Sequence, residues 1–148
     1  NYMWIQADEP GTYSGQCAEL CGASHALMAF KVIAQEPGDF DKWVASMKNP
    51  SSEPKSELAQ RGEQVFKQSC ASCHAVGGTD FKGKLGPDLT GFGNRGTLGS
   101  GILENNKENL AKWLHDPQAI KPGNLMKLPK RLSDDEVSAL VEYLHDLK

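Results

Sequence analysis

The chain has 148 residues, too few for two full domains of usual size but enough for one small domain and part of a second unit. Its 16 basic and 19 acidic residues give a net charge of −3, without the basic excess typical of nucleic-acid binding. No apolar run approaches the ~18 residues needed to cross a bilayer. The composition therefore argues against a nucleic-acid partner and against a membrane span within these residues.

The first chemically informative segment is a short stretch that contains four soft ligands: Cys17, Cys21, His25 and Met28. Thiolate, imidazole and thioether groups together suit copper in electron-transfer sites. Zinc is the main alternative metal, although zinc sites do not normally recruit methionine. A Cys17–Cys21 disulfide and a copper-chaperone motif are the other interpretations of the cysteine pair.

The whole segment is Gly15-Gln16-Cys17-Ala18-Glu19-Leu20-Cys21-Gly22, followed by His25 and Met28. It resembles the dinuclear copper loop of cytochrome c oxidase subunit II. The resemblance implies that both thiolates bridge two coppers, that His25 and Met28 each complete one copper, and that the Glu19 carbonyl is a further ligand. Nitrous oxide reductase has the same ligand spacing, but the residues between its cysteines are typically aromatic.

The same resemblance implies a cupredoxin-like β-domain, with residues 1–36 as its C-terminal part and strands over residues 3–6, 12–16 and 27–34. The family's copper site has a second histidine upstream of the first cysteine, and residues 1–16 contain none. The chain also begins at Asn1 without a start methionine. We therefore expect the C-terminal part of a longer subunit, without its N-terminal membrane helices and with an incomplete copper site.

A short helix and a linker are expected over residues 37–55. Residues 39–48 have an amphipathic pattern, with one apolar face made of Phe40, Trp43, Val44 and Met47. The following Asn49-Pro50-Ser51-Ser52-Glu53-Pro54-Lys55 predicts a linker. Seven residues span at most ~25 Å, so this tether keeps the next module close to the copper loop.

The second ligand motif is Cys70-Ala71-Ser72-Cys73-His74, the arrangement that attaches a c-type haem. Two thiols at this spacing can form thioethers to the vinyl groups of one porphyrin, with the histidine held under the iron. A thioredoxin-like redox pair or half of a zinc site are the alternatives. Residues 75–148 contain no cysteine, so a second zinc-binding pair is absent there.

Met126 is the predicted sixth ligand of the iron, because no other methionine follows the haem motif. Pro122 and Gly123 predict an irregular loop that can wrap over a haem face. His115 and His145 are the alternative ligands, but both lie in helical, polar segments. Basic residues flank the methionine and predict a basic rim beside the haem: Lys121, Lys127, Lys130 and Arg131.

The surrounding residues predict a small all-α domain over residues 56–148. Helices are expected over residues 56–67, 106–115 and 133–148, and the last begins with a capping box from Ser133 to Glu136. Residues 77–101 are glycine-rich loops that are too polar to form a core without a large apolar cofactor. A haem would supply that core.

Residues 56–148 resemble class I cytochrome c over nearly their whole length. Gly62 and Phe66 stand where that family crosses its first helix against its last, and Leu140 and Tyr143 are the matching partners. Gly86-Pro87-Asp88-Leu89 resembles the family's loop whose proline carbonyl accepts a hydrogen bond from the proximal histidine. The resemblance therefore implies that Pro87 orients His74.

Together these features predict subunit II of a haem–copper oxidase with a fused cytochrome c domain, on the outer face of a bacterial plasma membrane. The resemblance implies that a donor cytochrome c or an upstream reductase supplies electrons to the covalent haem. They then pass through dinuclear copper to the oxygen-reducing subunit I. The chain is thus expected to be part of an enzyme without catalytic residues of its own. The rival interpretations are a copper-containing nitric oxide or nitrous oxide reductase subunit, and a free electron-carrier cytochrome c.

Overall fold

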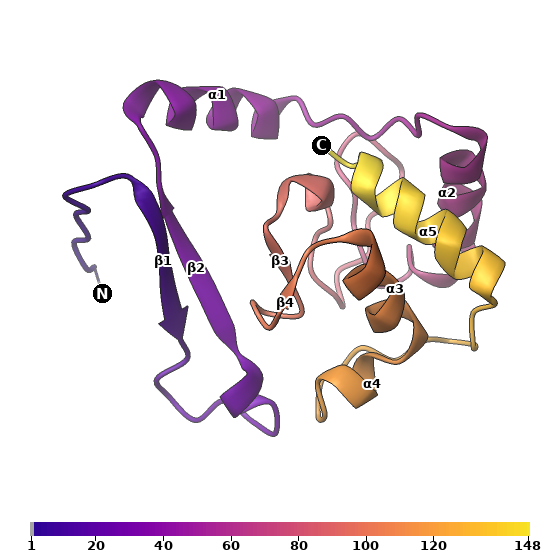
Figure 1. Cartoon of the computed structure of the whole chain (residues 1–148). Helices are drawn as coiled ribbons and strands as arrows, with labels where there is room; N and C mark the ends of the chain where they lie inside the picture. The colour runs from indigo at the N-terminus through magenta and orange to yellow at the C-terminus, as the bar shows by residue number, and fades with distance from the viewer. Residues whose placement is uncertain (1) are drawn as a thin grey trace.

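The computed structural model describes residues 2–148. Figure 1 shows a long two-stranded hairpin on one side of the molecule and a group of helices on the other, joined by a helix and an extended linker. The elements in chain order are β1 (Gly11–Gln16), β2 (Ala29–Ala34), α1 (Pro37–Lys48), α2 (Glu57–Ser69), β3 (Thr97–Leu98), β4 (Leu103–Glu104), α3 (Lys107–His115), α4 (Pro117–Ile120) and α5 (Asp134–Asp146). No helix in residues 2–148 is long and apolar enough to cross a membrane.

The hydrophobic core is built around the crossing of α2 and α5. Gly62 lies at this crossing, where a Cβ atom would overlap the carbonyl of Ala139 and come within 2.7 Å of the Tyr143 Cβ. The close approach brings Phe66 against Tyr143, with ring centroids 5.4 Å apart. Both aromatic residues are fully buried, and burying a side chain of this size contributes about 1.5–3 kcal/mol relative to exposure. The helix crossing expected from Gly62 and Phe66 is therefore present.

The helix starts follow local capping rules. The Ser56 side chain accepts from the Ala59 amide at 3.1 Å, and Ser133 and Glu136 form a reciprocal capping box. The predicted helices over residues 39–48, 56–67, 106–115 and 133–148 are confirmed to within a few residues. Helix α4 was not predicted. It forms because the Asp116 carboxylate accepts from the Gln118 and Ala119 amides, both at 3.0 Å.

The two sheets are small antiparallel hairpins. In the longer one Tyr13 pairs with Val32, and Gly15 with Phe30. This confirms strands within residues 12–16 and 27–34. The predicted strand over residues 3–6 is wrong, because residues 2–10 run without strand pairing and Trp4 is almost fully exposed. A strand needs a hydrogen-bonding neighbour, and residues 2–10 pair with neither edge of this hairpin.

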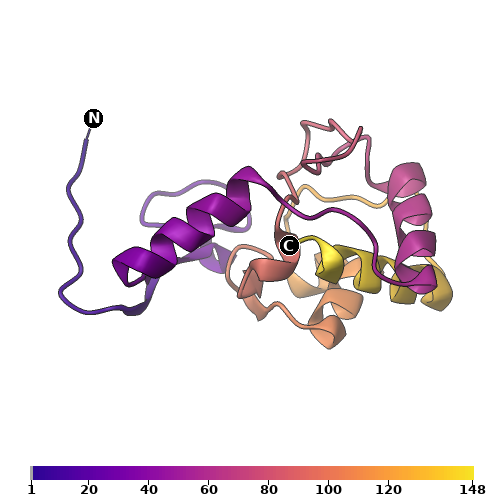
Figure 2. The same ribbon diagram turned by 90° about the horizontal axis from the view of Figure 1, so that it is seen from above.

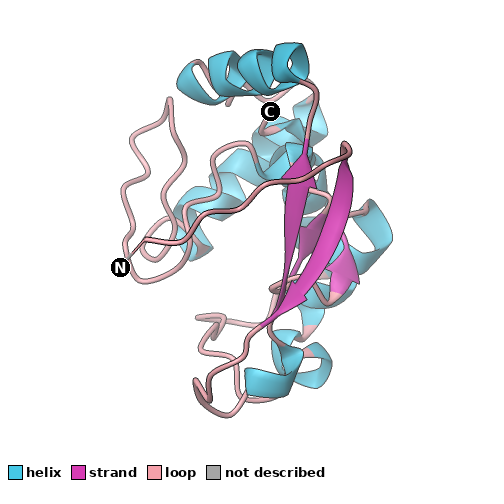
Figure 3. Cartoon of the chain, turned by 90° about the vertical axis from the view of Figure 1, so that its left-hand side faces the viewer, coloured by secondary structure: helices cyan, strands magenta, loops and turns pink. Residues whose placement is uncertain are grey.

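The short hairpin β3–β4 was not predicted: β3 lies within residues 77–101, which were expected to be loop, and β4 follows shortly after them. The linker after α1 packs along the C-terminal end of the chain. Ser51 and Lys148 exchange two backbone hydrogen bonds of 2.6 and 3.0 Å, and the Lys55 amide donates to the Asp146 carboxylate at 2.8 Å. In Figure 2 this linker runs from α1 toward α2, past the C-terminus. Figure 3 shows the two strands of the long hairpin running next to each other, with α1 lying beyond one end. The linker is thus anchored to the helical region rather than free.

Candidate metal centres

His74 is held in a fixed orientation by the loop that follows it. It is buried, and its Nδ1 lies 2.8 Å from the carbonyl oxygen of Pro87. Gly86 lies so close to the imidazole that a Cβ atom there would be 2.7 Å from Nδ1. Because Nδ1 is engaged by Pro87, Nε2 is the nitrogen left to bind a metal.

The two thiols of the second motif differ in environment. Cys70 ends helix α2 and is buried, whereas Cys73 is half-buried in the following turn. Burial, together with the nearby Cys73, raises the pKa of the Cys70 thiol to about 12. The reactive cysteine of a thioredoxin-like pair has a lowered pKa, so this environment does not suit that alternative.

Met126 lies in a loop whose geometry is set by several hydrogen bonds. Trp113 Nε1 donates to its sulfur at 3.3 Å, and its amide donates to the Asn124 side chain at 2.8 Å. The alternative ligand His115 instead lies 3.7 Å from the exposed Asp134 carboxylate. His145 lies in the last turn of α5. The methionine side chain is therefore oriented by its neighbours before any metal binds.

The first motif brings its ligand atoms together in the loop between β1 and β2. The Cys21 sulfur lies 3.6 Å from each of three atoms: the Cys17 sulfur, His25 Nδ1 and the Met28 sulfur. The Cys17 sulfur is also 3.2 Å from the carbonyl oxygen of Glu19. Both cysteines are free thiols, so the structure does not contain the disulfide alternative. All five residues singled out in the sequence thus converge on one point.

Cys17 affects the ionisation of the neighbouring Cys21 thiol. The pKa of Cys21 is raised above its ordinary value, chiefly by the hydrogen bond with Cys17 and then by desolvation and by the charge of Cys17. A bound metal would reverse this effect, because a metal favours the thiolate. Within residues 2–148 the cluster contains a single imidazole, that of His25.

Comparison with known proteins separates the chain into two matched segments. The family model described as cytochrome c matches residues 59–148, which is more than half of the chain. The chain belongs to the cytochrome c family. A second family model, described as the periplasmic domain of cytochrome c oxidase subunit II, matches residues 1–35.

Full-length relatives of this cytochrome c family member join the same two segments. The chain is 50% identical over its whole length to cytochrome c oxidase subunit 2 of Alkalihalophilus pseudofirmus, and 42% identical to that of Bacillus sp. strain PS3. It is 49% identical over 92% of its length to the Bacillus subtilis protein of that name. The chain covers 43%, 44% and 39% of these relatives, respectively, so it spans less than half of their length.

Both families imply metals that the observed ligands fit. Membership of the cytochrome c family implies a c-type haem, and the free thiols, the oriented imidazole and the thioether of Met126 are the donor set that such a haem needs. The subunit II match implies copper, and the loop supplies thiolate, imidazole and thioether donors around one point.

The predicted basic rim of the cytochrome needs correction. Lys121 is only 5% exposed, and its ammonium donates to Gly99 and Ser100. Lys130 is paired with Glu136 of the same region at 2.6 Å. Lys127 and Arg131 are exposed, and neither has such a pairing within residues 2–148. Two of the four predicted basic residues are therefore unpaired surface charges of the rim.

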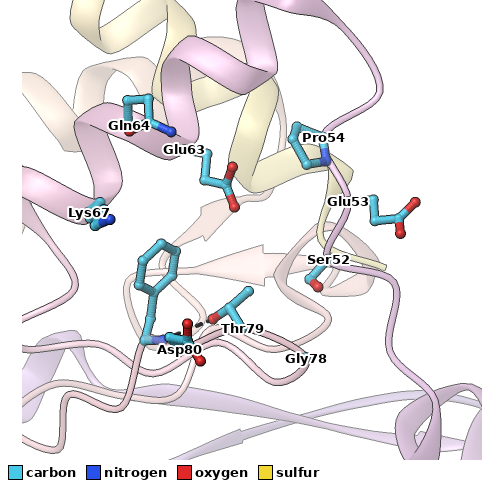
Figure 4. Close-up of a pocket in the computed structure, with 10 residues that line it drawn as sticks. Ser52, Glu53, Pro54, Glu63, Gln64, Lys67, Gly78, Thr79 and Asp80 are labelled. Atoms are coloured by element: carbon cyan, nitrogen blue, oxygen red, sulfur yellow. Dashed lines mark hydrogen bonds between the residues drawn. The ribbon is translucent and has the colours of Figure 1, made fainter.

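A crevice of about 470 Å³ lies on the linker side of α2, and none of the candidate ligands lines it. Figure 4 shows Ser52, Glu53 and Pro54 of the linker facing α2 across this space. Thr79 and Asp80, from the loop after the haem motif, also line it. Its lining is mixed in charge and open to solvent. The crevice is a gap beside the linker rather than part of either metal centre.

Sequence reasoning missed two residues that shape the centres. Trp113 donates to the Met126 sulfur, a contact that the helical pattern of residues 106–115 does not predict. Ser24, inside the copper loop, was passed over entirely, although it is buried. No local pattern signals this role, because the acceptor of its hydroxyl, the Pro122 carbonyl, lies 98 residues away in the sequence.

Proposed function

We propose that this chain transfers electrons between a covalent haem c and a dinuclear copper centre of a haem–copper oxidase. The observation that carries the proposal is the copper-type cluster, whose Cys17, Cys21 and His25 ligand atoms lie within 4.8 Å of one another. This cluster lies in the same chain as residues 59–148, which match the cytochrome c family. When bound, the two metal groups supply one-electron redox chemistry, and no catalytic residue of this chain is required.

On the haem side, Cys70 and Cys73 would form the two thioether links and His74 and Met126 would be the axial ligands. Pro87 fixes the imidazole through the 2.8 Å contact with Nδ1, which sets the ring plane and increases the basicity of Nε2. Trp113 orients the Met126 sulfur and withdraws electron density from it. A thioether ligand with this hydrogen bond favours the reduced iron and hence a higher potential.

On the copper side, Cys17 and Cys21 would bridge the metals, with His25, Met28 and the Glu19 carbonyl completing the ligands present here. The 3.6 Å separation of the two sulfurs is supported by a loop of only three residues between them. A second imidazole would come from residues outside this chain. We therefore expect copper to be absent or aberrant in the 148-residue chain alone.

The cellular location and the partners of the protein are also part of the proposal. The match to a periplasmic domain supports a position on the outer side of the plasma membrane. The partners would be the large oxidase subunit, which reduces oxygen, and a donor cytochrome c or upstream reductase. N-terminal helices in the longer subunit would provide membrane attachment.

Metal analysis of the full-length subunit tests the proposal. We expect one covalent haem and a dinuclear copper EPR signal for each chain. Cys17→Ser should remove the copper signal and leave the haem, whereas Cys73→Ser should weaken haem attachment and leave the copper. A full-length subunit that carries haem but never copper would instead be a free electron carrier. A normal dinuclear signal in the 148-residue chain would show that another group replaces the missing imidazole.

A further inference from the structure

Two hydrogen bonds join the copper loop to the helical region, and they bracket two of the candidate copper ligands. The Ser24 hydroxyl donates to the Pro122 carbonyl at 2.7 Å, and the Ala29 amide donates to the Ser100 carbonyl at 2.8 Å. His25 and Met28 lie between these two anchors in the sequence. Ser24 is the one buried residue among residues 2–36, with 9% of its surface exposed, and its hydrogen bond is partly buried.

The contact is a close backbone approach. Gly123 has φ +82°, and a Cβ atom there would lie 2.6 Å from the Cβ of Ala23. Only glycine combines this left-handed backbone with so short an approach. The loop that carries Met126 is therefore shaped to receive the copper loop at the residue next to Ser24.

The hydrogen bonds continue from this contact to Met126. The Met126 amide donates to Asn124 Oδ1 at 2.8 Å, and Asn124 Nδ2 donates to the Lys121 carbonyl at 2.7 Å. Pro122, the acceptor for Ser24, lies between Lys121 and Asn124. We define residues 121–126 as the methionine loop. It forms a compact bridge between the candidate iron ligand and the copper loop.

Lys121 links the two segments that contact the copper loop, the turn at Ser100 and the methionine loop. Its ammonium donates to the Gly99 carbonyl at 3.1 Å and to the Ser100 hydroxyl at 2.8 Å. A lysine that is 5% exposed loses hydration, and these bonds offset that loss. The Ser100 turn and the methionine loop therefore form one continuous surface.

Elsewhere the hairpin stands away from the helical region. A crevice of about 490 Å³ separates them, with Thr12 and Ile33 on the hairpin side and Gly91 and Thr97 on the other. Figure 1 shows the copper loop, at the end of the hairpin opposite α1, turned toward the segments around β3–β4 and α4. The contact is thus concentrated at the end that carries the ligands.

We propose that Ser24 is a positioning residue that docks the copper loop on the methionine loop, and that this contact is the passage for the electron. The inference rests on the proposed function and gives its internal route. In this step the ferrous haem loses one electron and the dinuclear copper gains it. No bond is made or broken, and no proton moves.

The test uses the full-length oxidase with Ser24→Ala, a rescue variant Ser24→Thr, and a matched control Ser14→Ala. Ser14 lies on the same hairpin, but its hydroxyl contacts only Lys31 of that hairpin within residues 2–148. Haem-to-copper transfer is followed after flash photoreduction of the haem. Amide hydrogen exchange at Ala29 reports the contact itself, and the copper EPR and haem spectra report whether each centre is intact.

We expect Ser24→Ala to slow transfer about fivefold, the effect of losing one hydrogen bond, and to speed exchange at Ala29. Ser24→Thr should restore both, and the spectra should not change. Equal transfer and exchange in Ser24→Ala and Ser14→Ala would overturn the inference. Absence of any transfer in the unmodified oxidase would instead refute the proposed function, and the exchange comparison would still decide whether Ser24 docks the loop.

Discussion

The two ligand sets of this chain are held in different ways. The haem-type ligands lie in a region with its own core, and within residues 2–148 every buried hydrophobic residue falls between Ala59 and Leu147. The copper-type ligands lie on a hairpin with almost no buried surface. Its strands expose Tyr13, Phe30 and Val32 on one face. Haem ligand geometry is therefore a property of the fold, whereas copper ligand geometry depends on a short loop and its neighbours.

This difference indicates which substitutions should disturb each set of ligands. A change in the α2–α5 crossing should damage the haem site from a distance, because the core sets the orientation of the whole region. A change far along the hairpin should leave the copper ligands in place, because their spacing is local. We expect substitutions in the helical region to show how far the haem side of this contrast depends on the core.

The largest effect is expected from Gly62→Val. The added side chain would collide with the Ala139 backbone of α5, which cannot move without separating the two helices. We expect the free energy of unfolding to fall by about 3 kcal/mol or more, measured by denaturant titration of the haem-loaded protein. Gly38→Ala is the control, because no atom lies within 4 Å of the position of its Cβ. Equal stability of the two variants would show that the core does not depend on this crossing.

A smaller loss is expected from Ser133→Ala at the start of α5. The substitution removes the hydroxyl that accepts from the Glu136 amide and breaks the capping box. Stability should fall by about 1 kcal/mol. Ser138→Ala, at an exposed position in the same helix, should leave stability nearly unchanged. If both serines behave alike in thermal unfolding, the cap does not contribute.

Trp113→Phe should affect the haem rather than stability. It removes the N–H donor to the Met126 sulfur but keeps an aromatic ring. The midpoint potential should fall by some tens of millivolts, the electrochemical equivalent of a weak hydrogen bond. Redox titration measures this shift in midpoint potential. Met126→Ala removes the ligand itself and therefore gives the largest shift to compare it with. A potential that stays constant in Trp113→Phe would mean that this contact does not tune the iron.

The smallest effect concerns pH. Burial, followed by the charges of Lys148 and Lys107, lowers the pKa of His145 below its ordinary value of 6.5. Below about pH 6.5 the unfolded chain therefore binds a proton that the folded chain resists, so stability falls as pH decreases. His145→Gln should reduce the loss of thermal stability between pH 7.5 and 5.5. His115→Gln, at an exposed position, is the control. If the pH dependence of thermal stability is unchanged in His145→Gln, His145 does not cause the loss of stability at low pH.

The sequence predicted most of this because the decisive signals are local. Helical periodicity and caps such as Ser133 act within one or two turns, and the ligands of the copper loop lie within one short segment. The failures involve distant partners. Residues 3–6 needed a neighbouring strand, and the burial of Lys121 depends on a turn 21 residues away. Ser24 finds its acceptor 98 residues away, which no local pattern encodes.

In the proposed function, the haem and copper centres of this protein exchange an electron. The direct measurement follows both centres in the full-length oxidase after flash photoreduction of the haem, with Cys21→Ser as the variant that lacks the copper. We predict that copper reduction rises with the same time course as haem reoxidation, and that both disappear in Cys21→Ser while the covalent haem remains. Haem reoxidation at the same rate in Cys21→Ser, or copper that stays oxidised while the haem loses its electron, would contradict this account.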